Sequence, residues 1–269
     1  MADLPLLIEP KTLEARLGSA NLLVVDLGKA DTYRKLHIPG AVFLDYAAIV
    51  AVNKPVMGLL PDDVTLERIF SAIGINSDTH VVAYDDEGGG KAARLMWTLE
   101  CAGHRHMSLL NGGLHAWANE GHPCDDTPVT PVATEFHATF NDSPVADSTY
   151  IRDRLDNPET RLLDVRSPAE YNGTRKYAER AGHIPGAVNC EWTALMDQQH
   201  NLRFKPDAEL LDMLSALGIT PDKEVIVYCQ THHRSAHSYV VLKHLGFTRV
   251  KGYPGSWSDW GNNPDLPVE

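Results

Sequence analysis

Short apolar runs alternate with amphipathic stretches along most of the chain. The runs at residues 22–26, 81–84 and 225–228 consist mainly of Val, Leu, Ile, Ala and Tyr. Residues 66–73 and 209–217 carry apolar side chains at helical spacing, which predicts helices. Continuous apolar strands between helices are typical of a parallel sheet covered on both faces. The pattern therefore predicts an α/β fold.

The same order of features occurs twice. The sequence HIPGA stands at residues 37–41 and again at 183–187. An apolar run that ends in an acid, residues 22–26, precedes the first copy, and residues 162–166 match it before the second. Ordered matches of this kind predict an internal duplication.

The match continues after the HIPGA segments. The segment FSAIGI at residues 70–75 corresponds to LSALGI at 214–219. Each contains a glycine where the end of a helix favours positive φ. Residues 81–84 match 225–228, and residues 113–117 stand roughly where residues 253–257 stand. The sequence thus predicts two tandem domains, each with a parallel sheet flanked by helices.

Between the two repeats lies a polar stretch, residues 121–145, in which four prolines interrupt any helix. Residues 134–140 inside it have the pattern of an edge strand. We expect an N-terminal domain at 1–122, a linker at 123–143 and a C-terminal domain at 144–269.

Composition narrows the class of protein. A content of 43% hydrophobic and 22% charged residues is that of a folded globular chain. The formal net charge of -12 repels phosphate backbones and anionic lipids, so we expect neither nucleic-acid nor membrane binding. No apolar run approaches the roughly 18 residues of a membrane span, and the start MADLPLLIEP lacks the features of a signal peptide. We expect a cytoplasmic monomer.

One of the four cysteines stands in a distinctive position. The buried strand predicted at 225–228 runs directly into the loop CQTHHRS at 229–235, and residues 236–245 then have a helical pattern. The carboxyl ends of parallel strands are where ligands bind in open α/β sheets, and a loop that leads into a helix presents its backbone N–H groups to an anion. Cys229 is therefore expected at the centre of an anion-binding loop. The other cysteines form no Cys-x-x-Cys pair, and we expect reduced thiols.

This thiol is well placed to ionise. The helix N-terminus, the loop amides and Arg234 all favour the thiolate, which is a strong nucleophile. The same surroundings would stabilise a persulfide anion between two half-reactions. The predicted catalytic residue is Cys229, and the predicted substrate-binding residues are Gln230, Thr231, His232, His233, Arg234 and Ser235.

Taken together, these features resemble the tandem-domain rhodanese family, the thiosulfate:cyanide sulfurtransferases, over nearly the full length of the chain. The resemblance rests on the two HIPGA segments, the two acid-ending strands, the VIVYC loop and the stretch GYPGSW at 252–257. The loop CQTHHRS is similar to that of bacterial rhodaneses.

The resemblance implies double displacement. The Cys229 thiolate takes the outer sulfur of thiosulfate, sulfite leaves, and cyanide or a thiol removes the sulfur from the persulfide. Thioredoxin-like or other sulfur-accepting proteins are further expected partners, and no cofactor beyond the Cys229 persulfide is expected. The N-terminal domain is expected to be catalytically silent because Asp85 stands in the place of Cys229.

Two departures from the family pattern concern the sulfur donor. Vertebrate-type rhodaneses have an arginine where this chain has Glu170, so Arg234 or Arg175 is expected to bind the anion instead. Mercaptopyruvate sulfurtransferases carry a neutral, hydroxyl-rich loop, whereas the present loop is bulky and potentially cationic. This favours thiosulfate, with 3-mercaptopyruvate or a persulfide carrier role as the alternatives.

Two other readings of the loop are weaker. Phosphatases of the cell-cycle type share this fold and use Cys-x5-Arg, whereas Cys229 to Arg234 is Cys-x4-Arg and forms a smaller cup. A metal site is not expected, because the adjacent His232 and His233 point apart on an ordinary backbone and no fourth ligand stands at a familiar spacing.

Several further residues have structural interpretations. Asp164 and Arg166 are expected to form an ion pair that organises the loop. His37 and His183 occur in both repeats and are expected to serve the fold. Trp192 is a possible wall of the pocket or a core residue, and the closing helix is expected to bury Trp257 and Trp260.

Overall fold

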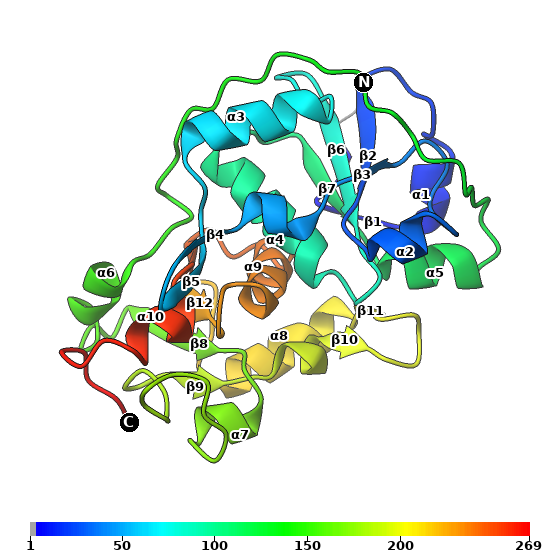
Figure 1. Cartoon of the computed structure of the whole chain (residues 1–269). Coiled ribbons are helices and arrows are strands. Elements are labelled where there is room, and N and C mark those ends of the chain that lie inside the picture. The colour runs from blue at the N-terminus through cyan, green and yellow to red at the C-terminus, as the bar shows by residue number, and fades with distance from the viewer. Residues whose placement is uncertain (1–3) are drawn as a thin grey trace. The chain divides into compact units, whose positions relative to one another are not determined.

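The computed structural model describes residues 4–269, which form two compact units. The first unit comprises residues 4–49, 61–141 and 197–204, and the second comprises residues 50–60, 142–196 and 205–269. Each unit contains a parallel sheet with helices packed against it (Figure 1). The predicted α/β class with two similar domains is confirmed.

The first unit has a five-stranded parallel sheet of order β1-β7-β6-β2-β3. Its strands are β1 (Leu7–Ile8), β2 (Leu22–Asp26), β3 (Val42–Phe43), β6 (His80–Tyr84) and β7 (Met107–Leu110). Its helices are α1 (Pro10–Glu14), α2 (Ala30–Tyr33), the 3-10 helix η1 (Tyr46–Ile49), α3 (Asp63–Ala72), α4 (Gly90–Cys101) and α5 (Gly113–Asn119). Helix α4 packs against β6 and β7, and nearly all of its residues are buried.

The second unit repeats this plan in a four-stranded parallel sheet of order β13-β12-β8-β9. Its strands are β8 (Thr160–Asp164), β9 (Val188–Asn189), β12 (Glu224–Tyr228) and β13 (Val250–Gly252). Its helices are α6 (Ser148–Arg152), α7 (Pro168–Tyr171), the 3-10 helix η2 (Trp192–Leu195), α8 (Asp207–Ala216), α9 (Arg234–His244) and α10 (Ser256–Trp260). Helix α9 packs against β12 and β13, and the predicted burial of Trp257 and Trp260 in α10 is confirmed.

The HIPGA segments have the same structural role in both units. His37 stacks on Tyr33, and its Nδ1 lies 2.6 Å from the Tyr33 carbonyl oxygen. His183 stacks on Tyr171 in the same way, with Nδ1 3.0 Å from the Tyr171 carbonyl oxygen. Both histidines therefore serve the fold, as predicted.

The predicted match of residues 22–26 with 162–166 is wrong by two positions. Strand β2 ends at Asp26, which pairs with Tyr84, and β8 ends at Asp164, which pairs with Tyr228. Asp26 therefore corresponds to Asp164, and Arg166 corresponds to Gly28. The error arose because both runs begin with Leu-Leu, whereas the sheet register is set by which side chains are buried.

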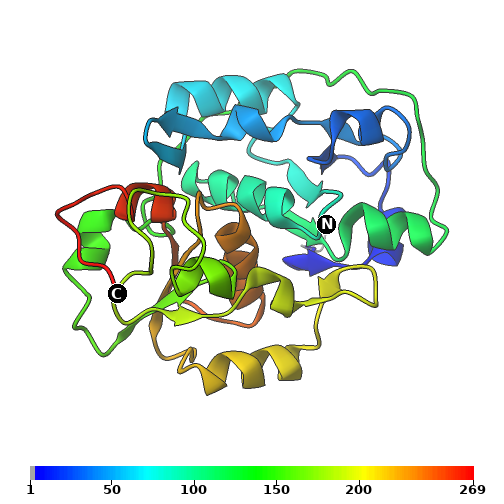
Figure 2. The ribbon, with the colours of Figure 1, turned by 60° about the horizontal axis from the view of Figure 1, so that its bottom comes forward.

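One short hairpin from each half of the sequence belongs to the other unit. Strands β4 (Ala51–Asn53) and β5 (Val56–Leu59) lie in the second unit beside α10, as Figures 1 and 2 show. The Met57 N–H donates to Ser258 Oγ over 2.9 Å. Gly58, at φ 77°, lies so close to the Cys229 loop that a Cβ there would stand 2.0 Å from the Thr231 carbonyl oxygen. The hairpin thus forms part of the packing around that loop.

The corresponding segment of the second half belongs to the first unit. Strands β10 (Met196–Asp197) and β11 (Arg203–Phe204) pair with each other, and residues 197–204 fall within the first unit. The Arg203 guanidinium pairs with Glu9 and Glu120 there. Neither unit is therefore continuous in sequence. The domain limits expected at residues 122 and 144 stay a prediction.

The connecting stretch lies along the first unit. Thr134 N–H donates to the Ser71 carbonyl oxygen, and Thr139 N–H donates to that of Ala102. Phe136 is buried and packs edge-on against Phe70. The edge strand predicted at 134–140 is wrong, because these hydrogen bonds go to helix termini rather than to a strand.

The helices of residues 4–269 are short, and the longest, α4, has 12 residues. None of them combines the length and hydropathy that a membrane crossing requires.

Candidate active site

The loop after β12 places Cys229 at the carboxyl end of the sheet, as the sequence predicts. Cys229 is 1% exposed, and helix α9 begins five residues later at Arg234. The loop is fixed from α10, since Trp257 N–H donates to the Cys229 carbonyl oxygen and Ser258 N–H to that of Gln230, both over 3.0 Å. The thiol is therefore buried in a rigid turn at the N-terminus of a helix.

The surroundings of Cys229 favour its ionised form. Burial by itself raises the pKa of this thiol. The Arg234 charge, the Ser235 hydroxyl at 3.4 Å from Sγ and the backbone N–H groups of Ser235 and Thr231 outweigh it and lower the pKa to about 7. About half of the thiol is then thiolate at neutral pH.

Arg234 is held by an ion pair that the sequence did not indicate. Its two terminal nitrogens donate to the two carboxylate oxygens of Glu170 over 2.7 and 2.8 Å. Burial of Glu170 raises its pKa, but Arg234 and Ser167 lower it to about 2, so the carboxylate is charged at all ordinary pH values. Arg234, which is expected to bind the donor anion, is therefore already paired with Glu170, and this carboxylate neutralises much of its charge.

Ser256 is a site residue that the sequence analysis missed. Its Oγ accepts from the N–H groups of Cys229 and His232, each over 3.2 Å, and donates to the Tyr253 carbonyl oxygen over 2.7 Å. Its backbone is left-handed, with φ 49°, which is unfavourable for a serine. The only signal in the sequence was its place in GYPGSW, because a positive φ outside glycine leaves no mark in a residue pattern.

The other predicted loop residues have different surroundings. His232 is buried with φ 54°, and its Nδ1 lies 2.8 Å from Ser235 Oγ. His233 is partly exposed and faces Trp192, with ring centroids 6.0 Å apart. Gln230 Nε2 donates to the Tyr177 carbonyl oxygen over 3.3 Å. His233 and Trp192 therefore lie together, whereas His232 is turned into the interior.

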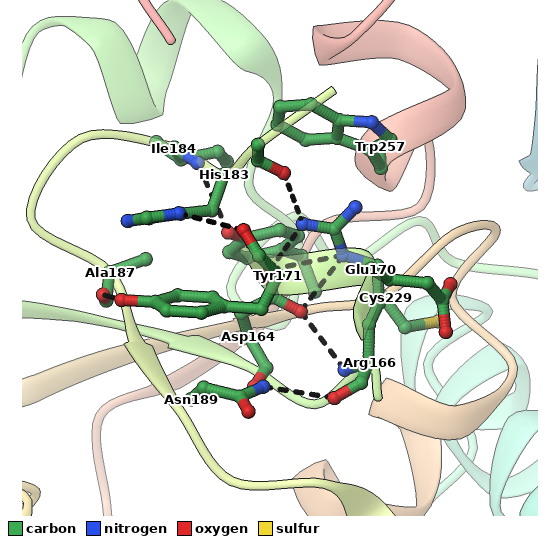
Figure 3. Close-up of polar contacts among 12 residues, drawn as sticks. Asp164, Arg166, Glu170, Tyr171, His183, Ile184, Ala187, Asn189, Cys229 and Trp257 are labelled. Carbon is green, nitrogen blue, oxygen red and sulfur yellow. Dashed lines mark hydrogen bonds and ion pairs between the residues drawn. The ribbon is translucent and has the colours of Figure 1, made fainter. Parts of the chain in front are cut away.

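Beneath the loop lies the predicted ion pair of Asp164 and Arg166, which is confirmed (Figure 3). Arg166 Nε lies 3.0 Å from both carboxylate oxygens of Asp164, and a terminal nitrogen donates to the Gly182 carbonyl oxygen over 2.8 Å. The guanidinium carbon lies 4.4 Å from the ring centroid of Trp257. Because both charged groups are almost fully buried and paired with each other, this network is a structural ion pair and not an anion site.

In the first unit, the loop after β6 carries a carboxylate where the second unit carries the thiol. Asp85 accepts from the backbone N–H groups of four loop and helix residues over 2.8–3.0 Å: Glu87, Gly89, Lys91 and Ala92. The loop amides therefore all donate to a carboxyl group of the protein itself, whose pKa is raised by burial.

The remaining cysteines lack such surroundings. Cys101 and Cys190 are buried, and burial raises the pKa of both thiols. Cys124 is exposed, and desolvation raises its pKa as well. Across residues 4–269, no three His, Cys, Asp or Glu side chains are arranged to hold a metal ion.

Comparison with known proteins agrees with this geometry. The model of the rhodanese-like domain matches residues 9–120 and again residues 147–263. A thiosulfate sulfurtransferase of Pseudomonas aeruginosa is 48% identical over 268 residues, which cover 100% of this chain and 98% of that protein. The sulfur carrier protein TtuD of Thermus thermophilus is 34% identical over 247 residues, 86% of this chain and 85% of that protein.

Among solved structures, wild-type EanB has the same fold, with a TM-score of 0.88 at 24% identity over 98% of this chain and 69% of that one. The repeated domain match, the full-length relatives and the thiol at the strand end lead to one conclusion. The chain belongs to the rhodanese family, with two rhodanese-like domains in tandem.

Proposed function

We propose that this protein is a sulfurtransferase that carries a sulfane sulfur atom as a persulfide on Cys229. The observation that supports it most directly is a buried thiol with a pKa of about 7 at a strand end, in contact with Arg234 and loop amides. A buried cysteine with a purely structural role would instead have a raised pKa, as Cys190 has.

The proposed reaction has two balanced steps. The Cys229 thiolate attacks the outer sulfur of thiosulfate, the S–S bond of thiosulfate breaks, and sulfite leaves with the bonding electron pair. Cyanide then attacks the outer sulfur of the Cys229 persulfide, and thiocyanate leaves while the thiolate is restored. Neither step transfers a proton, so the site needs charge stabilisation rather than a general base.

In this proposal Cys229 is the nucleophile, and its neighbours stabilise the anions. The N–H groups of Thr231 and Ser235 and the Arg234 guanidinium hold negative charge on the sulfur. His233 and Trp192 would line the side of the site from which the sulfur donor approaches. The natural acceptor would be cyanide, a small thiol or a thioredoxin-like protein, and the protein would act as a cytoplasmic monomer.

A second candidate is a persulfide carrier that exchanges sulfur with protein partners. The similarity to a sulfur carrier protein favours it. It differs from the first candidate in turnover rather than in chemistry, because both need the persulfide at Cys229. Rapid thiocyanate production from thiosulfate would favour the enzyme, whereas a persulfide that forms only with a protein donor would favour the carrier.

Mass spectrometry after incubation with thiosulfate tests the proposal. The intact protein should gain one sulfur atom, about 32 Da by the stoichiometry of a persulfide. Cys229→Ala should abolish the gain, and Cys190→Ala, which removes another buried thiol of the same unit, should keep it. A gain that survives in Cys229→Ala, or release of phosphate from a phosphoester at a comparable rate, would refute the assignment.

A further inference from the structure

Glu170 is built into the site by local structure. Ser167 caps helix α7 in a capping box, in which its side chain accepts from the Glu170 N–H and the Glu170 side chain accepts from the Ser167 N–H. The Ser167 hydroxyl also donates to Glu170 Oε2 over 2.8 Å. The Glu170 side chain is 5% exposed. These contacts within α7 hold the Glu170 carboxylate in place without any contribution from Arg234.

Arg234 connects this carboxylate with the reactive sulfur. Both oxygens of Glu170 accept from its terminal nitrogens, and the same guanidinium lowers the pKa of Cys229. A bidentate pair fixes the plane of a guanidinium as well as its position. Above the pKa of Cys229, the thiolate, Arg234 and Glu170 together carry one net negative charge. The buried ion pair of Asp164 with Arg166 in the same unit adds no net charge.

We propose that Glu170 is a specificity-determining residue that sets the charge of this site, which then discriminates against dianionic sulfur donors relative to monoanionic ones. The inference rests on the proposed function. Glu170 acts through Arg234, whose orientation it fixes while cancelling much of its charge as felt by an incoming donor. The substrate class that suits such a site is a sulfane-sulfur compound of low charge, such as a thiosulfonate or an organic persulfide, alongside thiosulfate.

The first unit shows that the fold does not require this carboxylate. Thr32 occupies the place of Glu170, because both residues lie six positions after the aspartate that ends β2 or β8. Thr32 Oγ1 donates to Asp86 Oδ2 over 3.3 Å instead. A helix of the same length, α2, forms without a charged residue at that position. Glu170 therefore has a role specific to the loop that holds Cys229.

Two donors that differ in charge test the proposal, thiosulfate as a dianion and methanethiosulfonate as a monoanion. Both give up a terminal sulfur to a thiolate and release a sulfur oxyanion. In Glu170→Gln at pH 9, where Cys229 is ionised with or without the substitution, KM for thiosulfate should fall about 10-fold and KM for methanethiosulfonate about 3-fold. The dianion responds with twice the free-energy change because it has twice the charge.

Controls separate this effect from a structural one. Glu179→Gln removes an exposed carboxylate of the same unit and should change neither KM appreciably. If Glu170→Gln does not fold, Glu170→Thr provides the residue found in the first unit. Equal changes for both donors, or a rise in the KM for thiosulfate alone, would overturn the proposal. If the unmodified protein forms no persulfide with either donor, the proposed function itself fails.

Discussion

The loop after β6 and the loop after β12 share one backbone plan and differ in the group at the centre. In each, a residue of the following segment donates its N–H to the central carbonyl oxygen over 3.0 Å, Leu114 to Asp85 and Trp257 to Cys229. Asp85 fills its loop with a carboxylate held by four amides. Cys229 instead places at the centre a thiol that ionises near neutral pH. The fold therefore supplies the same loop of backbone N–H groups in both units, and the side chain at its centre decides what those groups bind.

Three positions around the two central residues also differ between the units. Gly28, Thr32 and Gly113 of the first unit correspond to Arg166, Glu170 and Ser256 of the second. In the second unit Arg166 pairs with Asp164, Glu170 pairs with Arg234, and Ser256 accepts from two N–H groups of the Cys229 loop.

The aspartates that end β2 and β8 should respond oppositely to neutralisation. Asp164→Asn leaves the buried Arg166 without its partner and should lower the free energy of unfolding by about 3–5 kcal/mol. Asp26→Asn should raise it by up to about 3 kcal/mol at pH 7.5, because burial raises the pKa of Asp26 to about 6. Urea denaturation of both variants measures the difference. Two losses of similar size would contradict the difference in surroundings assigned to the two aspartates.

The pH dependence gives a separate check on Asp26. Its pKa is higher in the folded state than the value of 3.8 expected for the unfolded chain, so the folded state binds the proton more tightly. The stabilisation from this group is complete below pH 3.8 and is lost as the pH rises through about 6. The advantage of Asp26→Asn over the unmodified protein should therefore vanish below about pH 4. An advantage that does not change with pH would rule out the carboxyl group as its source.

Ser256 and Gly113 should be intolerant of alanine for different reasons. Ser256→Ala removes the acceptor of two buried N–H groups and should cost about 1–3 kcal/mol. Gly113→Ala places a Cβ 2.5 Å from the Asp85 carbonyl oxygen at φ 52°, with a cost of similar size. Thermal unfolding measures both. Only Ser256→Ala should also shift the pH midpoint of Cys229 alkylation upward, because it frees the loop.

A thiol moved to the first unit should remain unreactive. In Asp85→Cys with Cys229→Ala, the new thiol has Gly90 where Cys229 has Arg234, so no guanidinium favours its thiolate. Its alkylation at pH 7 should be about 15-fold slower than that of Cys229, from the thiolate fractions at pKa values of about 8.5 and 7. Iodoacetamide kinetics measure both rates. A rate equal to that of Cys229 would mean that the cradle alone activates sulfur.

Local patterns in the sequence were enough to place Cys229 and its loop. A buried strand, a turn and a helix in succession are specified by neighbouring residues, and the repeat supplied Asp85 as the contrast. The residues that contact the loop could not be predicted from local patterns, because Glu170 lies 64 residues from Arg234 and Ser256 lies 27 residues from Cys229. Such contacts depend on the register of the strands. The match of residues 22–26 with 162–166 was wrong in this register by two residues.

The exchanged hairpins bear on how such a chain can evolve. Once residues 50–60 of the first half pack within the second unit, against α10 and the turn at Thr231, the half without the thiol can no longer be lost without cost. A duplicated gene usually leaves one copy free to decay. Here the first unit has Asp85 in place of the thiol, yet residues 50–60 from its half of the sequence remain part of the packing around the Cys229 loop.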